Sequence, residues 1–492
     1  MKTISHLFVL LIFAFDACLV IAQPAASQPA GPDIADYQLG QQAFKQKIYQ
    51  QAFIYYQKAA MAGNAAAMTK LGDLYFTGRG VTKNYTQGLS WEYKAADLGN
   101  SDAMCDIGDC YCDGTGVPQD YKKAMAWLKK AVDLDNTYAM CQIGFMYELN
   151  EGVPEDYTKA MYWFQKAAAL GNSDAMRQIS DLYYHGDGVA KDDTQAFIWL
   201  KKAAALGNTR AMNDIAYDYA AGYHIPQDYE QALVWYQKAA DLDDAVAMVC
   251  IGDLYKNGQG ITQDYKQAFI WYQKAAAKDN LDAMVNIGNL YVNGYGVSRD
   301  YTKAMSWFQK ALTLANSIAT MSEQNSAPDP MLGKNYEAMV CIGLLYQNGF
   351  GVPKDLKHAM AMFQKAAALG NTDAMNNIGI LYEYGLGVSQ DYQQAIIWWQ
   401  KAANRMNADA LNNIGMAYIN GHGVTQDYSQ AMMSFWMASM MGNSEALVNL
   451  GKLYEYGLGV QKNEAYARSY FEKAAQLGNQ DAKKILANLP IQ

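Results

Sequence analysis

Side chains that could support catalysis or bind a metal are few in this chain and lie far apart in the sequence. The five histidines are His6, His185, His224, His358 and His422, and they do not have the spacing of metal ligands. The sequence contains no Gly-x-Ser-x-Gly elbow, no HExxH motif and no paired-cysteine motif. We therefore expect no catalytic residue, no metal site and no cofactor.

Paired carboxylates could act as a general acid and a general base. Asp73, Asp109, Asp181 and Asp253 recur at multiples of 36 residues. Equivalent residues of neighbouring repeats are expected to lie about 10 Å apart, which is the usual packing distance between helices. That distance does not favour shared proton chemistry. The chain is predicted not to be an enzyme.

The elements that must position these residues repeat along the chain. The dipeptide Ala-Met, twice replaced by Ala-Leu, recurs 36 residues apart with one longer step. Its alanines are Ala67, Ala103, Ala139, Ala175, Ala211, Ala247, Ala283, Ala338, Ala374, Ala410 and Ala446. A period of this size is typical of a supersecondary unit that cannot bury its apolar face alone, so neighbouring units must stack.

Residues 101–136 illustrate one unit, which contains two helical patterns separated by a Gly-rich turn. Ser101 is the expected N-cap of the first helix and Asp120 that of the second. Trp127 recurs in most units and is interpreted as a core residue rather than as part of a sugar-binding stripe. Asn150 and His224 replace glycines in the turns and are expected to tolerate a positive φ.

The shared pattern of Ala, Ile-Gly, Tyr, Gly-x-Gly-Val, Asp-Tyr, Ala, Trp, Lys-Ala-Ala and Gly-Asn closely resembles the Sel1-like repeat (SLR) family, a branch of the tetratricopeptide superfamily. The resemblance covers most of the chain. It implies an all-α fold, a right-handed α-solenoid of about twelve helical hairpins. Seven SLR repeats are expected over residues 67–312 and four over 335–480.

The ends of the array differ from this pattern. Residues 35–66 lack the long Gly-Val loop and are similar to an ordinary tetratricopeptide hairpin, and residues 481–492 are expected to form a capping helix and tail. Residues 313–334 interrupt the repeats. They form either a functional loop or a lengthened helix followed by a Pro-bearing linker.

The N-terminus is read as an export signal. Residues 1–22 combine a basic start with a short apolar stretch that Asp16 interrupts, which favours a cleaved signal peptide over a membrane anchor. Residues 23–34 are expected to be flexible, and no later segment is expected to span a membrane. The protein is predicted to be secreted or periplasmic, or to lie in the endoplasmic reticulum lumen if the source is eukaryotic.

Charge and cysteine content limit the partners. A net charge of -9 and a pI near 5.2 argue against nucleic acid. The six cysteines beyond Cys18 have irregular spacings, so buried or half-buried free thiols are favoured over disulfides.

The family resemblance implies that the first helix of each hairpin lines a concave groove. Positions two, six and nine residues after the repeat alanine share one helical face and are expected to be exposed there. The groove residues are Asp73, Asp109, Arg177, Asp181, Tyr184, Asp253, Leu344, Asn376, Ile380, Asn412, Met416 and Ile419. Amides beside apolar atoms suit an extended peptide or a protein segment. A solvated face with inter-repeat packing is the alternative.

The predicted function is therefore an exported scaffold that binds a protein or peptide, in a bacterial envelope or in host interaction. Two alternatives follow from the family resemblance alone. One is a cell-envelope enzyme like the cysteine-rich SLR proteins linked to β-lactams, although this chain lacks their regular cysteine pairs. The other is a lumenal adaptor of protein quality control.

Overall fold

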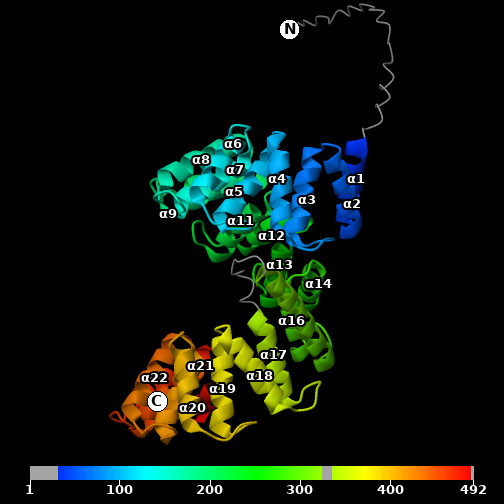
Figure 1. The fold of residues 1–492 in the computed structure, drawn as a ribbon. Coiled ribbons are helices and arrows are strands. Elements are labelled where there is room, and N and C mark those ends of the chain that lie inside the picture. Colours follow the sequence, from blue (N-terminus) through cyan, green and yellow to red (C-terminus); the bar gives the residue numbers. More distant parts are fainter. Residues whose placement is uncertain (1–31, 324–334, 489–492) are drawn as a thin grey trace, which may run out of the picture. The chain divides into compact units, whose positions relative to one another are not determined.

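The computed structural model describes residues 32–323 and 335–488, which contain 25 α-helices and no strand. The chain divides into two compact units with the boundary after Leu170, and each unit is described separately. Figure 1 shows that the helices are arranged as antiparallel pairs. None of the described helices is long and apolar enough to cross a membrane.

Unit 1 holds four helical hairpins. Its helices are α1 (Pro32–Lys45), α2 (Tyr49–Met61), α3 (Ala65–Thr77), α4 (Tyr85–Asp97), α5 (Ser101–Asp113), α6 (Tyr121–Val132), α7 (Thr137–Glu148) and α8 (Tyr157–Ala169). Each helix contacts the next one along the chain, within hairpins and between them. The unit is a segment of an α-solenoid.

Unit 2 holds eight hairpins and a closing helix. Its helices are α9 (Ser173–His185), α10 (Asp193–Ala205), α11 (Thr209–Ala221), α12 (Tyr229–Asp241), α13 (Ala245–Asn257), α14 (Tyr265–Ala276), α15 (Leu281–Asn293), α16 (Tyr301–Glu323), α17 (Asn335–Asn348), α18 (Leu356–Ala368), α19 (Thr372–Tyr384), α20 (Tyr392–Ala403), α21 (Ala408–Asn420), α22 (Tyr428–Met440), α23 (Ser444–Tyr456), α24 (Glu464–Gln476) and α25 (Gln480–Asn488). Here too each helix packs on the next. The twelve hairpins of the two units confirm the predicted all-α solenoid.

Side-chain caps define where the helices begin. The Asp120 carboxylate accepts hydrogen bonds from the backbone of Lys122 and Lys123 at the start of α6, as predicted. Ser101 was the wrong cap for α5, because the Asn100 side chain accepts the bond from the Ala103 N–H and Ser101 is already helical. Capping side chains satisfy N–H groups that the first helical turn leaves without partners.

The core of each hairpin is built from one repeated contact. In α7 and α8, the Phe164 ring lies so close to Gly144 that a Cβ atom there would be 2.6 Å from the ring. A glycine in a helix costs stability, and here that cost is offset because the aromatic ring reaches the backbone. The glycine within the first helix therefore marks a close helix crossing.

The tryptophans lie beside this core rather than inside it. Trp127 is half-buried, and the Lys130 ammonium lies 3.6 Å from the centre of its ring. The fully buried position is the next residue along the helix, such as Leu128 or Phe164. The prediction that the recurring tryptophan is a core residue was therefore wrong by one position, because the residue after it is the one that is fully buried.

The two replacements for turn glycines behave differently. Asn150 has φ 58°, as expected for a residue that takes the place of glycine. His224 is not one of the six described non-glycine residues with positive φ, so its predicted role was wrong. Its side chain explains the substitution, because the ring stacks on Tyr184 with the ring centres 3.8 Å apart.

The irregular segments are partly described. Only residues 46–48 connect α1 to α2, whereas residues 78–84 connect α3 to α4, so the first hairpin has the predicted short turn. Helix α1 begins at Pro32, inside the segment expected to be flexible. Helix α16 runs over 23 residues and still contacts α17, which supports the lengthened helix up to Glu323. Helix α25 is the predicted closing helix.

Several sequence predictions fall outside the described residues. They are the signal peptide at 1–22, the segment 23–31, the linker at 324–334 and the tail at 489–492.

Candidate functional site

A polar pocket in unit 2 lies between the first helices of three successive hairpins. Its volume is about 500 Å³. The lining residues are Asn376 and Ile380 from α19, Asp409, Asn412 and Asn413 from α21, and Gly442, Asn443, Ser444 and Glu445 at the start of α23. Three of the predicted groove residues, Asn376, Ile380 and Asn412, are thus brought together in one pocket.

The two asparagines are less exposed than the sequence predicted. Asn376 is 9% exposed and Asn412 is 6% exposed. The Asn413 amide donates to Oδ1 of Asn376 over 2.9 Å, and the Asn449 amide donates to Oδ1 of Asn412 over the same distance. The prediction of exposed amides was therefore wrong. They form an amide ladder between repeats, while both residues still line the pocket.

Negative charge lies at the mouth of the pocket. Asp409 and Glu445 are exposed. Asp409 accepts a hydrogen bond of 2.7 Å from the Asn443 amide, so its position is fixed between two hairpins. The pocket thus combines exposed carboxylates with buried and half-buried amides, a set suited to a polar or basic ligand.

The remaining apolar predictions have different surroundings. Leu344 is exposed, at 36%. Met416 and Ile419 are half-buried and pack against the core around Phe435. Neither of these two lines the pocket.

In the first hairpins of unit 2, the predicted charged residues bind one another and their neighbours. Nε of Arg177 lies 2.5 Å from a carboxylate oxygen of Asp214, and Nη1 of Arg177 lies 3.6 Å from a carboxylate oxygen of Asp181. The Tyr184 hydroxyl donates to Asp218 over 2.6 Å. These residues act as a network between hairpins.

The aspartates at this repeat position, Asp73, Asp109, Asp181 and Asp253, form a column along the aligned repeats. In other repeats too, members of this column have hydrogen-bond or ion-pair partners. Asp253 accepts a hydrogen bond of 2.7 Å from the Tyr272 hydroxyl and lies 2.7 Å from the Lys256 ammonium. In unit 1, Asp109 accepts bonds from Tyr138 and Gln142 over 2.8 and 3.1 Å.

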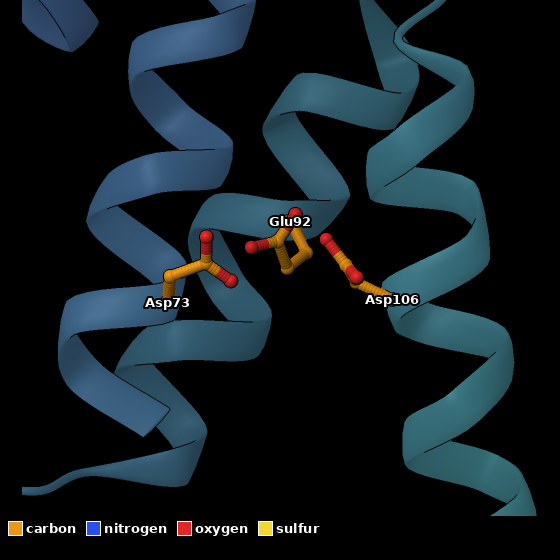
Figure 2. A group of neighbouring side chains, drawn as sticks. All are labelled: Asp73, Glu92 and Asp106. Carbon is orange, nitrogen blue, oxygen red and sulfur yellow. The ribbon is translucent and has the colours of Figure 1, made fainter. Parts of the chain in front are cut away.

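Asp73 is the exception in this column, because it faces other carboxylates. It pairs with Lys70 over 2.8 Å, and its remaining neighbours include Glu92 of α4 and Asp106 of α5. One oxygen atom from each of these three residues lies within 4.8 Å of the others. Figure 2 shows Glu92 between the two aspartates.

Sequence reasoning identified Asp73 alone in this group. Burial raises the pKa of Glu92 to about 10, and the neighbouring aspartates add to that shift. Burial likewise raises the pKa of Asp106 to about 7, with a contribution from Asp73. Aligning the repeats at the position after the recurring tryptophan would have revealed Glu92, because that position is otherwise apolar.

The cysteines agree with the prediction of free thiols. None of the six described cysteines forms a disulfide, and Cys105, Cys110 and Cys141 are buried while Cys112, Cys250 and Cys341 are half-buried. Burial raises the pKa of the Cys110 and Cys112 thiols to about 12, so neither is an activated nucleophile.

Comparison with protein families gives twelve matches to the Sel1 repeat model. The matched residues are 35–64, 65–100, 101–136, 137–172, 173–208, 209–244, 245–280, 281–316, 337–371, 372–405, 408–442 and 444–479. The first match includes the hairpin with the short turn. No curated protein matches the chain.

Two solved structures illustrate the likeness. A protective antigen present in uropathogenic Escherichia coli strains, with an SLR fold, is 31% identical over 89% of this chain and 91% of its own, with a TM-score of 0.52. A Sel1 repeat protein from Oxalobacter formigenes is 32% identical over 49% of this chain and 99% of its own, with a TM-score of 0.42. The repeat matches, the hairpins and the likeness to the Escherichia coli antigen agree: the chain belongs to the Sel1 repeat family, whose solenoid is a scaffold suited to protein interaction.

Proposed function

We propose that this chain is an exported scaffold that binds an extended peptide segment of a protein partner in the pocket between α19, α21 and α23. The observation that carries the proposal is the pocket itself, because the first helices of three successive hairpins line it. A peptide-binding groove of a tetratricopeptide-like array would be formed by these helices.

The lining specifies the chemistry of the segment. In the amide ladder, the Asn376 and Asn412 oxygens already accept hydrogen bonds, so their NH₂ groups are the parts suited to peptide carbonyl oxygens. Ile380 offers apolar surface beside them. Asp409 and Glu445 favour a lysine or arginine side chain at the mouth of the pocket. The ligand is therefore an extended segment with at least one basic residue.

The test begins with a displayed library of random peptides selected on the full chain. Binding of the enriched peptides is then measured by fluorescence polarisation. The double variant Asp409→Lys with Glu445→Lys should weaken binding at least about tenfold, since like charges would then face the basic peptide. The matched control is Glu464→Lys with Glu472→Lys on α24, which makes the same charge change at exposed positions outside the pocket.

The control variant should bind as the wild type does. The proposal is wrong if no peptide is enriched, or if both double variants weaken binding equally.

Export is a separate part of the proposal and rests on residues 1–22. Cells that produce the full chain should release a protein that lacks this leader, and N-terminal sequencing of the periplasmic or extracellular fraction measures it. Recovery of the uncleaved chain from the cytoplasm would contradict export.

A further inference from the structure

One buried side-chain position occurs in all twelve hairpins, and it holds an ionisable carboxyl group in only one of them. The second helix of each hairpin carries a small residue in its first turn, such as Ala124 of α6. Four residues later, eleven hairpins have a buried apolar or aromatic side chain. These residues are Tyr56, Leu128, Phe164, Leu200, Tyr236, Tyr272, Phe308, Phe363, Trp399, Phe435 and Phe471. The twelfth residue at this position is Glu92 of α4.

Glu92 is fully buried, with 0% of its surface exposed. Neither of its carboxyl oxygens has a hydrogen-bond partner among the described residues. The Thr69 hydroxyl is near enough to lower the pKa of Glu92 slightly against the effect of burial, but its hydrogen bond goes to the Ala65 carbonyl over 3.4 Å. Leaving a buried polar group without a partner is costly, so a carboxyl group at this position calls for a ligand.

The surroundings of Glu92 supply two more oxygen ligands. Asp73 of α3 and Asp106 of α5 are half-buried, and one oxygen from each lies within 4.8 Å of Glu92 and of the other (Figure 2). Calcium binds oxygen at about 2.3–2.6 Å, so two ligands on opposite sides of the ion are about 4.6–5.2 Å apart. The three oxygens therefore fit one calcium coordination shell without a change of backbone.

The contrast with Asp253 shows what is unusual about Asp73. Asp253 holds the same repeat position. There the buried side chain of the next helix is Tyr272, whose hydroxyl donates a hydrogen bond to the carboxylate. At Asp73 the corresponding side chain is a second carboxyl group, which has no proton to donate when ionised. A cation is the partner that satisfies both groups.

The charges agree with this assignment. Once a bound cation has displaced the protons that burial favours on Glu92 and Asp106, the three carboxylates carry three negative charges, and Lys70, which lies 2.8 Å from Asp73, carries one positive charge. A divalent cation would bring the cluster to neutrality. Asp73 has two oxygens, so it is able to keep Lys70 on one and ligate the ion with the other.

We propose that Asp73, Glu92 and Asp106 bind one hard divalent cation, with Ca²⁺ the best fit, at the junction of α3, α4 and α5. The ligands come from two successive hairpins. The bound ion would therefore stabilise the packing of these hairpins, in addition to satisfying Glu92. The site is independent of the peptide pocket, which belongs to the other unit.

The test uses the full chain after dialysis against EDTA. Isothermal titration calorimetry with CaCl₂ should give one saturable site per chain, and 1 mM Ca²⁺ should raise Tm by at least about 3 °C. Parallel titrations with MgCl₂ and MnCl₂ rank the ions. Calcium should bind most tightly, because magnesium requires a tighter octahedral shell.

Glu92→Gln and Asp106→Asn remove one ionised ligand each, and each should weaken calcium binding at least about tenfold and reduce the Tm response. Asp214→Asn is the matched control, since it makes the same change as Asp106→Asn at the same repeat position in unit 2, and it should retain the response. Glu92→Leu, which copies Leu128 of the next hairpin, keeps the test informative if the glutamine variant does not fold.

Absence of saturable binding of all three ions at millimolar concentration would overturn the proposal. An unchanged calcium affinity in both Glu92→Gln and Asp106→Asn would also overturn it.

Discussion

The Glu92 carboxyl group packs directly on Gly72, in the place where the Phe164 ring packs on Gly144 two hairpins further along. A Cβ atom on Gly72 would overlap the Glu92 side chain. Glu92 thus packs against the helical glycine as the aromatic residues do in other hairpins, although its side chain is a carboxyl group. In the absence of a cation, this site should weaken the fold.

Replacing Glu92 by leucine should stabilise the EDTA-treated protein. The change removes a buried carboxyl group that lacks a hydrogen-bond partner and installs leucine, the residue that is fully buried at the equivalent position 128 and packs on Gly108. The expected gain is about 1–3 kcal/mol. Urea denaturation followed by circular dichroism measures it, and a lower midpoint in the variant would contradict the account.

The stability of the EDTA-treated protein should fall as pH rises from about 5 to 8. The pKa of Glu92 is raised to about 10 and that of Asp106 to about 7, so the folded state holds protons that the unfolded state has released above pH 4–5. Asp109, with its pKa raised to about 6, has the same sign. Lys70 stays protonated throughout this range, because burial, which lowers its pKa, is outweighed by the hydrogen bond and ion pair with Asp73, so that its pKa lies above its ordinary value.

Thermal unfolding at pH 5, 6, 7 and 8 tests this dependence. Glu92→Leu should show a shallower decline, since one of the raised carboxyl groups is gone. A wild-type Tm that rises steadily over this pH range would be incompatible with these shifts.

The helical glycines should differ in their tolerance of alanine. In Gly144→Ala the new Cβ atom would lie 2.6 Å from the rigid Phe164 ring, whereas in Gly108→Ala it would meet the flexible end of Leu128 at 3.0 Å. Gly144→Ala should therefore lower stability by about 1–3 kcal/mol. Gly108→Ala should be close to neutral, because alanine also favours the helix. Equal Tm values for the two variants would show that the ring does not set the spacing.

His224 should stabilise unit 2 through its side chain rather than through its backbone. Its Nδ1 lies 2.9 Å from the buried Asp218 carboxylate, and its ring stacks on Tyr184. His224→Ala should cost about 1–2 kcal/mol. His358→Ala is the control, because that pair with Asp355 is exposed and should contribute less than about 0.5 kcal/mol. A stabilising effect of His224→Gly would instead favour the backbone explanation.

Much of the fold was predictable because it rests on periodicity. The two helical patterns within residues 101–136 identified the hairpin, and Asp120 identified the start of its second helix. These are local properties, which a single repeat already specifies. The Asn100 cap was missed in favour of Ser101 because Asn and Ser are both good caps in adjacent positions, and only the backbone geometry decides between them.

The candidate site was predictable only in part. The helical face that contains Asn376, Ile380 and Asn412 was found from spacing, and the structure places all three around one pocket. Their burial was not predictable, because it depends on the amides of Asn413 and Asn449, which come from the next repeat. The role of Glu92 as a proposed metal ligand was missed for a related reason, since it depends on carboxylates that come from three different helices.

The most direct test of the central claim is photo-crosslinking of a selected peptide to a chain that carries a photoreactive phenylalanine analogue. The analogue replaces Ile380 in the pocket or, in the control, the exposed Met433 of α22. The account predicts a crosslinked adduct from position 380 that excess unlabelled peptide abolishes, and little adduct from position 433. Efficient crosslinking from position 433 with none from position 380 would contradict the claim that the pocket between α19, α21 and α23 binds the partner.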